Sequence, residues 1–144
     1  MLACDLAIAT DDASFGTPEI KVGLFPYMIM ALIFRHVGRK RGLEMVLTGD
    51  RLPASEAAEI GLINRAVPRA QLDGEVAALA AKISAKSPAI LRLGKQAFHT
   101  MADMPMDEAL EYLRGMLLVN TLTEDAAEGI MAFLSKRDPV WKGR

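Results

Sequence analysis

The first ten residues place the strongest constraint on the fold. Residues 2–9 form a short, mostly apolar run, which is typical of a strand buried on both faces of a sheet. Thr10, Asp11 and Asp12 then favour a turn. The rest of the chain offers only two or three further short strands, too few to cover such a strand on both sides. We therefore expect further strands upstream of Met1, which would make this chain part of a longer protein.

The pattern after this run predicts alternating short elements. The residue before Pro18 is pushed out of the α region, so residues 15–18 should be extended or turning. Two apolar helices are predicted over 28–37 and 39–48, each followed by a glycine, and both should be buried. A short helix over 55–59 then precedes a strand-like run over 62–67 that ends at Pro68.

The remainder of the chain is predicted to be helical. The expected helices cover residues 71–86, 88–101, 107–122 and 124–136. Their predicted N-caps are Ser87, Asp107 and Thr123, and Pro88 occupies a first helical position. In the third helix an apolar face, which needs a partner surface, is formed by Leu110, Tyr112, Leu113, Met116 and Leu117. We therefore predict two regions, an α/β part over residues 1–68 and a helical part over residues 69–144.

Composition excludes several classes of function. A formal net charge of -1, with only short basic clusters, argues against a nucleic-acid groove but leaves a small anionic ligand possible. The single cysteine, Cys4, lies in an apolar run, so we expect it to be buried and the protein to occupy a reducing cytoplasm. The longest apolar stretch, residues 23–34, is too short to span a bilayer. Neither His36 nor His99 has neighbours at metal-ligand spacing, so no metal is predicted.

Five segments carry a family resemblance when they are taken together. They are residues 4–9, residues 13–26 with the string Phe-Gly-Thr-Pro-Glu, residues 47–49, residues 57–64 and residues 132–141. In this order and at these spacings they resemble the C-terminal half of the enoyl-CoA hydratase/isomerase (crotonase) family. Single elements such as Leu-Thr-Gly are common helix ends, so the joint order carries the resemblance.

The resemblance implies a fold and a substrate class. The fold would be α/β, the last part of a crotonase-like ββα spiral followed by a C-terminal helical region that assembles trimers or hexamers. The substrate would be an acyl-CoA thioester, with coenzyme A as part of the substrate and no separate cofactor. In the family, two backbone N–H groups stabilise the enolate that forms on the thioester, and fixed donors of this kind act where charge develops. By the resemblance, both donors lie upstream of Met1.

Glu19 is the one catalytic candidate that the resemblance assigns to this chain. Hydratases of the family use two glutamates around a water molecule; the first would lie upstream of Met1, and the second matches Glu19. A carboxyl group on a constrained Pro-Glu turn can both accept and donate a proton. Without the resemblance, a glutamate after proline is most simply a solvated turn residue. Three alternatives stay open: an isomerase that uses Glu19 alone, a non-catalytic oligomerisation fragment, and another reaction of the family, such as dehalogenation, decarboxylation or thioester hydrolysis.

Substrate contacts are implied at Pro18, Gly23, Pro26, Tyr27, Phe133 and Lys136. Many family members continue after the position of Pro26 with a Gly-Ala-Gly-Gly-Thr turn, whereas this chain has Tyr-Met-Ile-Met-Ala. The bulky residues could alter acyl specificity or simply pack a helix start. Lys136 could meet a CoA phosphate, or could be a solvated lysine beside core aromatics.

Overall fold

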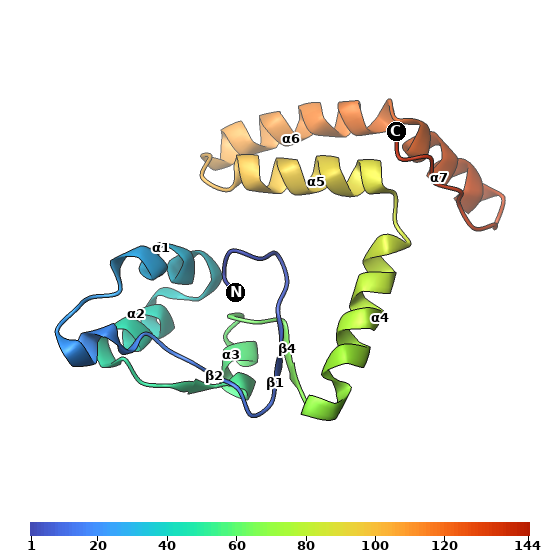
Figure 1. Cartoon of the computed structure of the whole chain (residues 1–144). Helices are drawn as coiled ribbons and strands as arrows, with labels where there is room; N and C mark the ends of the chain where they lie inside the picture. Colours follow the sequence, from blue (N-terminus) through green and yellow to red (C-terminus); the bar gives the residue numbers. More distant parts are fainter. The chain divides into compact units, whose positions relative to one another are not determined.

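The computed structural model describes all residues from 1 to 144, drawn in Figure 1. The chain divides into two compact units, unit 1 (residues 1–78) and unit 2 (residues 79–144). The sequence places the division at residues 68 and 69, ten residues earlier. In the structure the division falls within helix α4 (Leu72–Ser84).

Unit 1 contains two pairs of short strands. Strand β1 (Ile8–Thr10) pairs in parallel with β4 (Arg65–Val67), and β2 (Ser14–Phe15) pairs antiparallel with β3 (Leu52–Pro53). The Asn64 side chain accepts a hydrogen bond from the Ala7 N–H at 2.7 Å, and the Asn64 N–H donates to the Ala7 carbonyl at 2.8 Å. These reciprocal bonds fix the register of the parallel pair.

The predicted strand over residues 2–9 is mostly wrong. Residues 2–5 form turns and bends, and the strand begins only at Ile8. Cys4, which we expected to be buried, is exposed, and so is Leu6. The physical reason is that only residues 8–10 are paired with a neighbouring strand, β4, so no ladder extends the strand back toward Met1.

Unit 1 also contains three helices, drawn in Figure 1. They are α1 (Tyr27–His36), α2 (Arg39–Thr48) and α3 (Ala54–Glu59), which confirms the predicted positions within about one residue. Their shared core contains Ile33, Val37, Met45, Val46, Leu62 and Ile63. The expectation that α1 is buried is wrong, because Ile33 is its only buried residue. The predicted strand over 62–67 shrinks to β4.

Unit 2 consists of helices and a C-terminal tail, residues 135–144. Helices α5 (Pro88–Met101) and α6 (Met106–Thr121) run side by side, followed by α7 (Glu124–Leu134) (Figure 1). The Ser87 and Thr123 side chains accept hydrogen bonds from the N–H groups of Ile90 and Ala126, both at 3.1 Å, which confirms these two N-caps. The prediction that Asp107 is the N-cap of α6 is wrong. Pro105, already extended, takes the cap position, and Asp107 lies inside the first turn.

Small side chains dominate the buried positions of unit 2. The buried apolar residues are Ala89, Ala97, Ala109 and Ala132. By contrast, Leu110 and Leu117 on the predicted apolar face of α6 are exposed within the chain. None of the helices combines the length and the apolar character that a membrane crossing requires.

Candidate functional site

Glu19 lies in a short 3-10 helix, Pro18–Val22, that is fastened at both ends. Before it, the buried Thr17 hydroxyl donates to the Met45 carbonyl of α2 at 3.0 Å. After it, the Leu24 N–H donates to the Glu19 carbonyl at 3.1 Å, and Gly23 adopts the left-handed conformation with φ 79°. Glycine suits this position because side chains with a Cβ rarely adopt it. The backbone of Glu19 is therefore held in place by tertiary contacts.

The Glu19 carboxyl group has one oxygen in an unusual state. Its Oε2 atom is buried and has no hydrogen-bond partner in the protein. Most buried polar atoms are paired, since an unpaired one loses its water without compensation. The Glu19 Oε2 atom therefore lacks a donor that would compensate for its burial.

An apolar strip follows Glu19 along the chain. Val22, Leu24, Tyr27 and Met28 are all large, apolar and exposed, and Tyr27 is 70% exposed. The rings of Phe25 and Tyr27 lie 5.2 Å apart and tilted, while Pro26 is buried before α1. Tyr27 therefore contacts Phe25 at the helix start, while most of its surface and that of Met28 is exposed.

The predicted substrate contacts in unit 2 lie at the end of α7. Phe133 is 82% exposed, and Lys136 is exposed with φ 51°. The Lys136 N–H donates to the Phe133 carbonyl at 3.2 Å, and the Arg137 N–H donates to the Ala132 carbonyl at 3.1 Å. These two bonds make a Schellman motif, a helix end that usually places glycine where Lys136 stands.

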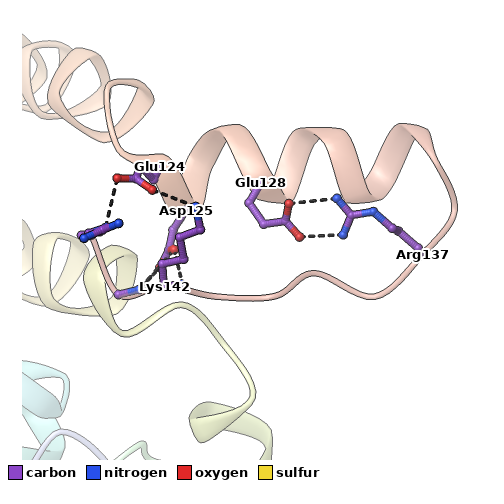
Figure 2. A network of polar contacts seen from close by, with 7 residues as sticks. Glu124, Asp125, Glu128, Arg137 and Lys142 are labelled. Carbon is purple, nitrogen blue, oxygen red and sulfur yellow. Dashed lines mark hydrogen bonds and ion pairs between the residues drawn. The ribbon is translucent and has the colours of Figure 1, made fainter.

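Figure 2 shows a polar network that binds the tail to α7. The two carboxylate oxygens of Glu128 accept from the Arg137 guanidinium at 2.6 and 2.8 Å, and one of them also accepts from the Val140 N–H at 2.8 Å. These contacts, the Arg137 hydrogen bonds foremost, lower the pKa of Glu128 to about 2. The same pairing raises the pKa of Arg137.

Asp125 forms a second anchor, closer to the start of α7 (Figure 2). It is only 1% exposed, and its carboxylate accepts from the Ser87 hydroxyl at 2.5 Å and from the N–H groups of Lys142 and Gly143. The Ser87 hydrogen bond is the main cause of its lowered pKa. Neighbouring Glu124 pairs with Lys142 and Arg144, and this pairing lowers its pKa as well.

The sequence predicted Ser87 as an N-cap, but the network that joins Ser87 and Asp125 to the tail was not predicted. The capping pattern was the available signal. It is a local signal, whereas the partners of Asp125 come from positions 87, 142 and 143. No local periodicity reports such a contact.

The predicted site residues fall into two groups. Pro18, Glu19, Gly23, Pro26 and Tyr27 lie together along one segment of unit 1, and Phe133 and Lys136 lie in unit 2. An open hollow of about 720 Å³ lies on α6, beside Tyr112 and Met116, and contains none of them. The structure has no group of three or more His, Cys, Asp or Glu side chains able to hold a metal ion.

Comparison with known proteins finds one family along the whole chain. A model of the enoyl-CoA hydratase/isomerase family matches residues 1–144. Enoyl-CoA hydratase domain-containing protein 3, mitochondrial, of Rattus norvegicus is 42% identical over 141 residues, which cover 96% of this chain and 46% of the relative. Carnitinyl-CoA dehydratase of Escherichia coli (strain K12) is 38% identical over 148 residues, covering 99% of this chain and 57% of the relative.

Solved structures agree with this match. The crystal structure of an enoyl-CoA hydratase from Mycobacterium smegmatis superposes with a TM-score of 0.95 at 38% identity, over 97% of this chain and 55% of that one. Human enoyl Coenzyme A hydratase domain-containing protein 3 gives a TM-score of 0.93 at 38% identity, with the same coverage. The fold is therefore the α/β fold of these proteins. The chain spans about half the length of the relatives it matches.

Proposed function

The chain belongs to the enoyl-CoA hydratase/isomerase family, and on that premise we propose that it acts on acyl-CoA thioesters, with Glu19 as the proton-transfer carboxylate. In the hydration direction, a water molecule gives one proton to a carboxylate base supplied by the rest of the protein as its oxygen bonds to the β-carbon of a 2-enoyl-CoA, and the α-carbon receives a proton. Glu19 would deliver that proton. In the reverse direction it would remove it, as water leaves the β-carbon.

One observation supports this role above the others, the buried and unpartnered Oε2 atom of Glu19. A carboxyl group that transfers protons must reach the substrate without being held by the protein's own donors. The 3-10 helix is fixed through Thr17 and Leu24, so the Glu19 backbone is positioned while none of the protein's own donors binds this oxygen. The exposed apolar strip at Val22, Leu24 and Tyr27 suits an acyl chain.

We propose further that the chain corresponds to the C-terminal half of its relatives, and that the oxyanion donors and the second glutamate come from the other half. A single missing donor raises the barrier of comparable reactions by about 3 kcal/mol. Residues 1–144 alone should therefore hydrate crotonyl-CoA slowly or not at all. Robust turnover by this chain would contradict the assignment.

The direct test is Glu19→Gln in the protein that carries this chain together with the rest of the relatives' length. Hydration of crotonyl-CoA, followed by loss of the enoyl thioester absorbance, should fall by about 10² to 10⁴, the usual contribution of general acid–base catalysis. Glu59→Gln is the matched control, since it removes an exposed carboxylate from α3 of the same unit. Unchanged turnover in Glu19→Gln would remove Glu19 from the mechanism.

An isomerase that moves a proton with Glu19 alone is the second candidate. It would convert a 3-enoyl-CoA into a 2-enoyl-CoA without adding water, so the two substrates distinguish the reactions. The similarity to proteins named hydratase and dehydratase favours the addition and removal of water.

The third candidate is an assembly fragment without catalytic activity. The exposed leucines of α6 suit subunit contacts in a trimer or hexamer, which light scattering would detect. This candidate predicts a stable oligomer that binds no acyl-CoA. The cytoplasmic location stays a prediction.

A further inference from the structure

The end of α2 lies directly against the short helix that carries Glu19. Gly49, the C-cap of α2, is buried and adopts the left-handed conformation with φ 63°. A Cβ on Gly49 would lie 2.6 Å from Ile20 Cγ2 and 3.1 Å from the Thr17 carbonyl oxygen. The Cγ2 atom is attached to a stiff, branched Cβ, and the carbonyl belongs to the backbone. Even a methyl group would therefore push the Glu19 segment away from α2.

A second glycine permits the same close approach from the other side of this contact. Gly16 follows β2, and a Cβ on it would lie 2.8 Å from the Asp50 carbonyl oxygen, another backbone atom. The antiparallel pairing of β2 with β3, in which Phe15 lies opposite Leu52, leads Gly16 to this position. The segment before Glu19 and the turn after α2 thus meet closely at two glycines.

Polar contacts fasten the same junction. The Met45 carbonyl accepts from the Gly49 N–H at 3.1 Å and from the Thr17 hydroxyl at 3.0 Å. Thr17 is only 4% exposed, so this hydroxyl depends on the Met45 carbonyl as its partner. Lys21 also donates to the Asp50 carboxylate at 3.2 Å, but both side chains are exposed and such pairs contribute little. The buried hydroxyl and the two glycines therefore define the junction.

We propose that Gly16, Thr17 and Gly49 are positioning residues, which seat the Glu19 helix against the end of α2 and so set where the Glu19 carboxyl group lies. This inference rests on the proposed function, in which Glu19 transfers the proton. It gives the Phe-Gly-Thr-Pro-Glu and Leu-Thr-Gly strings one shared task. A displacement of about 1 Å can cost a reaction about 10²-fold in rate, so the seat matters although it does not touch the substrate.

Hydration of crotonyl-CoA by the protein that carries this chain together with the rest of the relatives' length tests the inference. Gly49→Ala should lower kcat by about 10²-fold and leave KM nearly unchanged, because Glu19 moves while the other substrate contacts stay. Gly61→Ala is the matched control. Gly61 has a left-handed φ of 80°, but a Cβ on it would meet only the His36 carbonyl, at an ordinary 3.6 Å. It should carry the same backbone strain and keep the native kcat.

Thr17→Val tests the same contact without added bulk. It removes the hydroxyl but keeps the branched shape, and the Met45 carbonyl keeps the Gly49 N–H as its donor. This variant should lower kcat by about tenfold, whereas Thr17→Ser, which retains the hydroxyl, should keep the native value. In the Glu19→Gln background, neither Thr17→Val nor Gly49→Ala should lower kcat further, since their effect passes through the Glu19 carboxyl group. A merely structural loss would persist there.

Hydrogen exchange on the 144-residue chain gives a readout that needs no catalysis. The Gly23 and Leu24 amides donate to the carbonyls of Ile20 and Glu19 at 3.2 and 3.1 Å. Exchange at these two amides should be faster in Gly49→Ala than in Gly61→Ala. Equal rates in the two variants would contradict the seating of the Glu19 helix on α2.

The outcomes distinguish this inference from the proposed function. If Glu19→Gln hydrates crotonyl-CoA as fast as the native protein, the proposed function is wrong and the positioning role falls with it. If Glu19→Gln is impaired while Gly49→Ala and Thr17→Val keep the native kcat, only the positioning role is overturned. A loss that persists in full in the Glu19→Gln background overturns it too.

Discussion

Units 1 and 2 are both held together, but by different interactions. Unit 1 buries branched and long aliphatic side chains, such as Ile33, Val46 and Met45, around a parallel strand pair. Unit 2 buries alanines together with Ser87 and Asp125, while many of its leucines are exposed. Its tail is fixed by hydrogen bonds to carboxylates. Apolar packing therefore dominates in unit 1, whereas hydrogen bonds to buried or paired carboxylates hold the tail of unit 2.

This difference predicts how each unit loses its structure. A packed aliphatic core is sensitive to lost volume and largely insensitive to pH. A structure anchored by ionised carboxylates is sensitive to acid and to the loss of single hydrogen-bonding groups. Substitutions of matched size in the two units can test this contrast.

The largest effect is expected from Ile33→Ala in the core of unit 1. Ile33 is 1% exposed, and truncation of such a residue costs about 2 to 5 kcal/mol of unfolding free energy. Met28→Ala on the same helix, at a position 88% exposed, should change it by less than about 0.5 kcal/mol. Urea unfolding measures the unfolding free energy of each variant. Hydrogen exchange resolved by segment should show that the loss of protection in Ile33→Ala lies in unit 1. Equal loss of protection in both units would break the contrast.

Acid should act mainly on unit 2. Three of its carboxyl groups, Glu124, Asp125 and Glu128, have lowered pKa values, whereas in unit 1 only Asp12, beside the Thr10 hydroxyl and Arg69, has a clear lowering. A carboxyl group with a lowered folded pKa stabilises the fold above its unfolded value and loses that contribution as the pH falls through the folded one. For Glu128 this window runs from 4.5 down to about 2.

Two quantities test this between neutral pH and the lower end of that window. They are the rate of hydrogen exchange at the amides of the tail and the melting temperature of the chain. Glu128→Gln should flatten the pH dependence of the tail, because the amide does not titrate. An acid response that is confined to unit 1 would contradict the prediction.

Ser87→Ala should have an intermediate effect, about 1 to 2 kcal/mol of unfolding free energy. The substitution removes the N-cap of α5 and also the hydroxyl that donates to Asp125. Thr123→Ala removes a cap of similar geometry whose hydroxyl does not contact Asp125, so it should cost less, about 1 kcal/mol. Thermal unfolding of both variants makes the comparison, and equal losses would mean that the Asp125 contact adds no stability.

The smallest effect is expected from a gain of one methyl group on a helix. Gly94 in α5 has open space where a Cβ would lie, so Gly94→Ala should stabilise unit 2 by about 0.5 to 1 kcal/mol. Gly42→Ala in α2 would place the Cβ 2.8 Å from the Phe34 ring and should lower the stability of unit 1. Melting temperatures that shift in the same direction would contradict the contrast in packing.

The sequence predicted the helices well because their signals are local. The left-handed Gly49 ends α2 as predicted, whereas α1 ends at the extended Val37 and Gly38 is the N-cap of α2. The caps at Ser87 and Thr123 start α5 and α7 within one residue of the expected positions. Family membership was equally readable, since it depends on ordered motifs. The catalytic and binding roles of Glu19 and Lys136 stay predictions.

The failures concern contacts between distant residues. The apolar run at residues 2–9 indicates a buried strand, but burial depends on neighbouring strands that the run itself does not specify. The apolar helix α1 buries Ile33 alone, because periodicity cannot tell how many sides a neighbour covers. The carboxylate anchors were missed because the tail residues that meet them, such as Val140 and Gly143, are joined through their backbones.

The parallel pairing of β1 and β4 also sets an order of events during folding. Ala7 and Asn64, which close this pair, are 57 residues apart in sequence, and forming such a contact costs loop entropy before it adds stability. Helices α5 and α6, joined by a short turn, face no such delay. Pulse-labelled hydrogen exchange should therefore find α5 and α6 protected before β4. On the ribosome, β1 must therefore wait until residue 67 has emerged before it can pair with β4.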